Sequence, residues 1–187
     1  MKSHAAVPEM NSKPPDSTVH TLSLVTRDHP GVLVRIALVF ARRGHNIESL
    51  AVSPGATSGY ARMTITSRGH GPTLKQIILQ LAKLVDVVDI TDHLELPSCE
   101  AEVALVKVKD NHAAQSTASA LEKLANVEIV DRSEGILVFR LVGHSGDVER
   151  FIEELRPLGI QELVRSGAIV IDKGASRFAH LMGASLK

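Results

Sequence analysis

Several residue types and patterns that mark particular protein classes are scarce in this sequence. Aromatic residues make up 3% of the 187 residues and tryptophan is absent, so a core has to be built mainly from aliphatic side chains. Basic and acidic residues balance at 21 each, which leaves no net field that would attract nucleic acid or an anionic membrane surface. The 44% apolar share is enough for one large domain or two small ones.

Cysteine and long apolar runs are also nearly missing. The single cysteine, Cys99, cannot form a disulfide within the chain, and neither cysteines nor histidines have the spacing of a metal site. This usage is typical of a reducing, cytoplasmic compartment. No apolar run approaches the roughly 18 residues that cross a bilayer, and no secretion signal is visible. Residues 1–19, with three prolines, are expected to form a disordered tail.

In the first half of the chain, β-branched segments alternate with segments of helical periodicity. The turn Asp28-His29-Pro30-Gly31 separates the first strand from a helix that should begin just after Gly31. A second helix is predicted at Leu74–Leu81. The predicted strands are Thr21–Thr26, Asn46–Val52, Tyr60–Ser67 and Val85–Leu94.

The second half repeats this order after a break at Pro97 and Ser98, with a linker near residues 95–100. Its predicted elements are a strand at Ala101–Val108, a helix at Ala114–Leu124, strands at Val127–Val130 and Ile136–Val142, a helix at Val148–Leu155 and a strand at Ala168–Ile171. The order is βαββαβ twice, which predicts an α+β protein of two tandem ferredoxin-like units. We place these units at residues 20–95 and 96–174, followed by a tail at 175–187. Their exposed sheet edges favour dimerisation.

No group of residues has the pattern of a catalytic site. Asp86, Asp89 and Asp92 recur every third residue, but alternate faces of a strand would separate neighbours in this series, so surface charge is the simpler interpretation. The nine histidines fall mostly at predicted turns and are expected to be exposed. Glycines at Gly31 and Gly55 belong to neither a dinucleotide-binding motif nor a P-loop. The sequence therefore predicts no catalytic residues and no metal.

The start of the first predicted helix has binding chemistry. Unpaired backbone N–H groups and the positive end of the helix dipole can hold a small carboxylate, and Gly31 lets it approach the backbone closely. The alternative is purely structural: Pro30 and Gly31 make a tight turn and Asp28 caps the helix.

Six separated motifs resemble one known family. The runs Asp28–Leu33, Gly44–Leu50 and Arg62–Ile65 are similar to an ACT domain of the acetohydroxyacid synthase (acetolactate synthase) small-subunit type. Three later runs resemble the second-helix exit, the second-domain opening and the C-terminal signature of the same subunits: Leu81–Asp89, Ala104–Val108 and Leu155–Gly167. The resemblance covers about residues 20–174, so the first unit is expected to be an ACT domain.

The resemblance implies a non-catalytic regulatory subunit that activates a separate catalytic large subunit. Thiamine diphosphate and Mg²⁺ would belong to that partner, with no cofactor in this chain. The resemblance also implies a homodimer through the ACT domains, with a branched-chain amino acid, usually valine, bound at the interface as a feedback inhibitor. The ligand carboxylate would take the N–H groups of Gly31, Val32 and Leu33, Asn46 would bond its polar end, and Val32, Leu33 and Ile47 would line the apolar pocket.

One position departs from the family pattern. Small subunits commonly have asparagine where this chain has Asp28, and an ionised carboxylate accepts hydrogen bonds but donates none. Asp28 would attract the ammonium group of an amino acid and repel its carboxylate. A different functional class, a free-standing double-ACT regulator that senses an amino acid alone, is the alternative, and the C-terminal signature favours the subunit.

Overall fold

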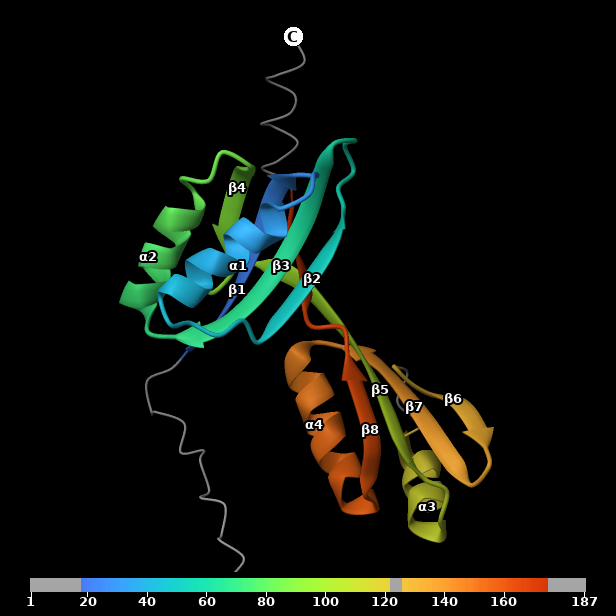
Figure 1. Cartoon of the computed structure of the whole chain (residues 1–187). Coiled ribbons are helices and arrows are strands. Elements are labelled where there is room, and N and C mark those ends of the chain that lie inside the picture. Colours follow the sequence, from blue (N-terminus) through green and yellow to red (C-terminus); the bar gives the residue numbers. More distant parts are fainter. Residues whose placement is uncertain (1–17, 122–125, 175–187) are drawn as a thin grey trace, which may run out of the picture.

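The computed structural model describes residues 18–121 and 126–174, which form two α+β domains joined by extended chain (Figure 1). The expected tails, residues 1–19 and 175–187, lie outside the described residues except for Thr18 and Val19, which already belong to the first strand. The predicted division at residues 95 and 96 falls between the last strand of the first sheet, which ends at Asp92, and the next strand, which begins at Ser98. The tandem ferredoxin-like fold is confirmed.

The first domain has the predicted order of elements, shifted by a few residues at their ends. The elements are β1 (Thr18–Arg27), α1 (Val32–Arg42), β2 (Ser49–Pro54), β3 (Tyr60–Gly69), α2 (Gly71–Leu81) and β4 (Val87–Asp92). The strands form an antiparallel sheet in the order β2-β3-β1-β4, so β2 and β4 are its edges. Strand β1, which leads into the loop before α1, is central and pairs with both β3 and β4.

Alternation along the strands decides which face of this sheet is covered by α1 and α2. Leu22 and Leu24 of β1 are fully buried against the helices with Ile36 and Phe40 of α1. The intervening Ser23 lies on the opposite face, where the sheet is polar. Both helices pack on the same face of the sheet, so they leave its other face uncovered.

The second domain has the elements β5 (Ser98–Lys109), α3 (His112–Leu121), β6 (Val127–Ser133), β7 (Ile136–Gly143), α4 (Ser145–Leu155), a 3₁₀ turn (Arg156–Leu158), β8 (Ile160–Arg165) and β9 (Ile169–Asp172). Residues 122–124 of the predicted helix at Ala114–Leu124 lie outside the described residues. The sheet order is β6-β7-β5-β8. Its core is built like that of the first domain. Val106 of β5, Phe139 of β7 and Phe151 of α4 belong to one buried cluster between the sheet and a helix.

The last strand of the second sheet differs from the prediction. The fourth strand is β8, within the C-terminal signature, whereas the predicted strand at Ala168–Ile171 corresponds to β9 and leaves that sheet. β9 pairs instead with residues 98–101, the first part of β5. Residues 98–100 are therefore strand rather than linker. β8 was missed because only Ile160, Leu163 and Val164 are large and apolar in it, without strict alternation.

Residues 98–101 of β5 together with β9 make a two-stranded connection, which we call the connecting ribbon. It extends from the second domain to the polar face of the first sheet, as the yellow-green and red segments of Figure 1 show. Arg62 Nη2 on β3 donates to the carbonyl oxygen of Val170 on β9 at 3.3 Å. The turn after β8 also contacts the first domain, because a Cβ at Gly167 would lie 2.7 Å from the Cβ of Ser49. Two chain segments, not one, thus join the domains.

Candidate functional site

Helix α1 starts without a side-chain cap. Gly31 precedes its first residue with a φ of 88°, a left-handed conformation that glycine adopts without strain. The Gly31 carbonyl accepts from Arg35 N at 3.1 Å, and Val32 N reaches the His29 carbonyl only at 3.5 Å. The remaining amides of the first turn have no intrahelical acceptors. This end of α1 is therefore open, and its amides could receive an anion. The alternative in which Asp28 caps the helix is wrong, since α1 has no side-chain cap and Asp28 is exposed.

A buried carboxylate fixes the loop that precedes α1. Asp86, in the turn before β4, is 5% exposed. Its Oδ1 lies 2.8 Å from His29 Nε2 and its Oδ2 lies 2.6 Å from Arg35 Nη2. Burial raises the pKa of the Asp86 carboxyl, but the hydrogen bonds and charges of Arg35 and His29 outweigh it, so the pKa lies below its ordinary value. Asp86 thus stays ionised and ties α1 to the start of β4.

The prediction of surface charge was wrong for Asp86. The interpretation assumed one continuous strand through Asp86, Asp89 and Asp92, whereas β4 begins only at Val87.

The ion pair between Asp86 and Arg35 also affects the start of α1. It holds Arg35 so that Nη1 lies 3.5 Å from the position of a Cβ on Gly31. A guanidinium therefore stands beside the open amides, which adds positive charge at the same point.

The structure brings four of the six predicted ligand residues together. Asp28, Gly31 and Leu33 surround the start of α1, and all three are exposed. Val32 belongs there through its backbone alone. Its side chain is 3% exposed and packs in the core of the first domain, so its predicted place in the lining of a ligand pocket is wrong. The helical pattern could have shown this, because Val32, Ile36 and Phe40 form the inward face of α1.

Asn46 and Ile47 lie at the other end of α1. The Asn46 carbonyl accepts from Ser67 Oγ at 2.8 Å, which leaves its exposed side chain free to turn outward, while Ile47 is half-buried against the core. An 11-residue helix is about 16 Å long, far more than a single amino acid can span. Within one chain the six residues therefore form two separate half-sites.

A group of polar side chains at the domain junction was not predicted. His93 Nε2 and Ser23 Oγ lie 2.8 Å apart, and His93 Nδ1 lies 3.4 Å from Asp172 Oδ1 on β9. The order of atoms is that of a catalytic triad, but Ser23 is 5% exposed in the middle of β1, so a substrate cannot reach its hydroxyl. Burial, opposed by Asp172, lowers the pKa of His93. The expectation of exposed histidines was therefore wrong for His93, and also for buried His20, which pairs with Asp92.

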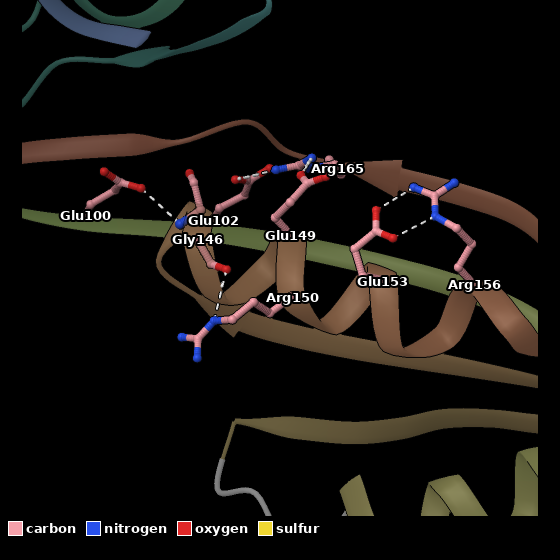
Figure 2. A network of polar contacts seen from close by, with 9 residues as sticks. Glu100, Glu102, Gly146, Glu149, Arg150, Glu153, Arg156 and Arg165 are labelled. Atoms are coloured by element: carbon pink, nitrogen blue, oxygen red, sulfur yellow. Dashed lines mark hydrogen bonds and ion pairs between the residues drawn. The ribbon is translucent and has the colours of Figure 1, made fainter. Parts of the chain in front are cut away.

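A second polar group fixes the C-terminal signature to β5 and α4 (Figure 2). Arg165 donates to both carboxylate oxygens of buried Glu102, at 2.7 and 3.1 Å, and to Glu149 at 2.9 Å. These bonds, that to Glu102 first, raise the pKa of Arg165. Glu100 accepts from Ser145 N at 3.0 Å and so caps α4. Each of these charged side chains is bonded to another group of the chain, which makes a structural role sufficient.

The described residues contain no group of three or more histidine, cysteine, aspartate or glutamate side chains arranged to hold a metal. In the same part of the chain, no helix is long and apolar enough to span a bilayer. The start of α1 combines free amides with a nearby guanidinium, which suits it to an anionic ligand.

Two family models match the chain. One, described as the AHAS small subunit-like ACT domain, matches residues 22–89, and another, described as the small subunit of acetolactate synthase, matches residues 101–174. The sequence is 37% identical over 155 residues to an acetolactate synthase small subunit of Mycobacterium bovis, covering 83% of this chain and 92% of the relative. It is 39% identical over 160 residues to a probable acetolactate synthase small subunit of Methanothermobacter thermautotrophicus, covering 83% and 94%.

Solved structures give the same relationship. The fold is similar to the crystal structure of an acetolactate synthase small subunit from Thermotoga maritima, with a TM-score of 0.74 and 32% identity. The match covers 84% of this chain and 99% of that one. Both domains are therefore shared.

Proposed function

Because this chain belongs to the family of acetolactate synthase small subunits, we propose that it activates a catalytic large subunit and makes it sensitive to feedback inhibition by a branched-chain amino acid, most readily valine. The open start of α1 supports this proposal most directly. Its free amides and the nearby Arg35 suit an amino acid carboxylate. The resulting enzyme complex would supply the amino acids that control it.

The separation of the two half-sites supports binding between two copies of the chain. The carboxylate would lie at Gly31 and Leu33 of one copy, while Asn46 of a second copy would bond the polar end of the ligand. Leu33, which is 40% exposed, and half-buried Ile47 would enclose the aliphatic side chain. A homodimer through the first domains would thus complete two equivalent sites by symmetry.

The chemistry of acetolactate formation would belong to the catalytic partner, with its thiamine diphosphate and Mg²⁺. This chain is proposed to be non-catalytic and without a cofactor, acting in the cytoplasm by binding the partner and the effector. The family match of the second domain over residues 101–174 favours this role over that of a free-standing amino-acid sensor, which would not need a subunit-specific domain.

Reconstitution with the catalytic subunit tests the proposal. Activity of the catalytic subunit should rise when this chain is added and should then become sensitive to valine, with none from this chain alone. An Arg35→Gln variant should weaken inhibition while keeping activation, and Arg150→Gln, an exposed ion-paired arginine of α4 that lies outside both half-sites, is the matched control. If neither the rate nor the inhibitor response changed on mixing, the subunit role would be wrong.

A further inference from the structure

A cavity of about 470 Å³ lies where the connecting ribbon covers the first domain. Most of its lining is apolar, including Val52 from β2, Ala101 from β5 and Ile169 and Ile171 from β9. Its volume is in the usual range of small-molecule sites, roughly 300–1,000 Å³. The start of α1 does not contribute to it, so this cavity is separate from the site proposed above.

Arg62 places a positive charge in the wall of this cavity. Two of its five N–H donors are used, by Nη2, which donates to Ser23 Oγ at 3.4 Å and to the Val170 carbonyl at 3.3 Å. Both acceptors are neutral and both bonds are long. Among residues 18–121 and 126–174, no carboxylate lies within ion-pair distance of Arg62, which is half-buried.

The carboxylates near the cavity face groups other than Arg62. Asp172 faces His93 at 3.4 Å and Asp92 faces His20 at 2.9 Å. Glu100, the other charged residue of the lining, accepts from the start of α4. Removing a cation from water into aliphatic surroundings costs free energy unless an anion pairs with it. The missing partner is therefore expected to be an anion that also has an apolar body.

We propose that this cavity binds a small aliphatic carboxylate, with its carboxylate on the free Nη1 donors of Arg62 and its hydrocarbon part against Ala51, Ala101 and Ile169. A charge-assisted hydrogen bond from an arginine to a carboxylate suits such a site. Branched-chain amino acids and the corresponding 2-oxo acids share this chemistry. Because the ribbon forms one wall, an occupied cavity would bind the two domains together.

Titration calorimetry on the full chain with 3-methylbutanoate tests the site, and 3-methylbutanamide, with the same shape and no charge, is the matched ligand. The measurements are made in the Gly31→Asp background, which removes the proposed site at α1. We expect the carboxylate to bind and the amide to bind at least about tenfold more weakly, the scale of a charged hydrogen bond. Valine and 3-methyl-2-oxobutanoate then show whether amino acids or 2-oxo acids are preferred.

Variants assign the binding to Arg62. Arg62→Gln should lower affinity about tenfold or more, whereas Arg68→Gln should not, because Arg68 lies on the same face of β3 but is already paired with Glu48 at 2.9 Å. Ala101→Leu keeps the charge and fills the cavity, and it should also abolish binding.

Three results would overturn the proposal. The first is equal binding of the acid and the amide, and the second is unchanged binding in Arg62→Gln. The third is that the carboxylate does not bind when Arg62 is present while Arg62→Gln changes the oligomeric state, which would mean that a second copy of the chain fills the cavity. Loss of feedback inhibition through Gly31 is measured separately, so failure of either site leaves the other testable.

Discussion

The two domains differ most at a point where their chains follow the same path. After β1, Asp28 N donates to the carbonyl of Gly59 in the β2–β3 connection at 2.9 Å, and after β5, Asp110 N donates to the carbonyl of Gly135 in the β6–β7 connection at 2.8 Å. In the second domain Asn111 follows and its Oδ1 accepts from Ala114 N at 2.9 Å. The start of α3 is thereby closed by a side chain, whereas that of α1 is open.

The difference shows that the open helix start is not required by the fold. Four residues, Asp28 to Gly31, separate β1 from α1, but only two separate β5 from α3. Four residues after Gly31, the first domain has Arg35, which ion-pairs with Asp86. Four residues after Asn111, the second domain has Gln115, which donates to Asp110 at 2.8 Å. Of these two helix starts, only that of α1 combines positive charge with free amides, which supports placing the effector there.

Closing the first helix start should have the largest effect. Gly31→Asp puts a carboxylate beside Arg35 Nη1, where it would occupy the position proposed for the effector, and it also strains a left-handed residue. We expect effector affinity to fall by about 100-fold or more, since a charge-assisted anion contact and the space for it are both lost. Titration calorimetry with valine measures this loss.

Activation of the catalytic subunit is the control for Gly31→Asp. It should survive, because Gly31 is exposed and lies outside both cores. Gly31→Ala separates strain from occupation: it has the same left-handed backbone but no charge, so it should bind valine better than Gly31→Asp. Valine binding by Gly31→Asp at the wild-type affinity would show that the effector lies elsewhere.

Removing the charge of Asp86 should have the next largest effect, and this effect should depend on pH. The pKa of Asp86 is lowered from its ordinary 3.8 in the folded chain, so its stabilising contribution is present above that value and is lost as the pH falls through the folded value. Wild type should exceed Asp86→Asn in unfolding free energy at pH 5, and the difference should shrink towards pH 3. Urea titrations of both proteins measure it, and a pH-independent difference would show that packing is responsible.

The fold could be predicted from the sequence because the periodicity and turn signals of both halves agree with their final environment. Strands in the middle of each sheet, such as β1 and β7, can be recognised because their apolar residues alternate with polar ones or form a short continuous run. The exception is β8, whose partly exposed position at the sheet edge needs few apolar residues. The departure of β9 to the first domain could not be predicted, because it depends on pairing with a strand about 70 residues earlier.

The candidate site was only partly predictable. The helix start at Gly31 follows from local turn chemistry, so its position was correct. Asp86 was not identified, because its partners His29 and Arg35 are more than 50 residues away and only the folded sheet brings them together. The same reason applies to His93 and Asp172. Whether Asn46 and Ile47 join the site depends on a second copy and stays a prediction.

Opening the second helix start should have a smaller effect, on stability alone. Asn111→Ala removes the cap of Ala114 N, and loss of such a cap typically costs about 1 kcal/mol. Asn111→Asp should be nearly neutral, since aspartate caps as well as asparagine. Thermal unfolding measures both variants. We expect no new amino-acid binding in Asn111→Ala, because Gln115 stands where Arg35 stands in the first domain; new binding would mean that free amides alone are sufficient.

The smallest effect is expected from Asp28→Asn, which should tighten inhibition by valine. Asp28 is held by its backbone bond to Gly59, so the substitution should leave the loop in place. Two carboxylates roughly 6 Å apart repel by about 0.7 kcal/mol in water and about 3 kcal/mol near a protein surface. Asp28 is exposed, which favours the lower figure, and attraction to the ligand ammonium cancels part of it. A two- to threefold gain in affinity is therefore expected, on the order of 0.5 kcal/mol. Inhibition of the reconstituted enzyme by valine, leucine and isoleucine measures it, and high salt should remove the gain. Weaker inhibition in Asp28→Asn would show that Asp28 binds the ammonium group and that the first domain selects its ligand by attraction at both ends.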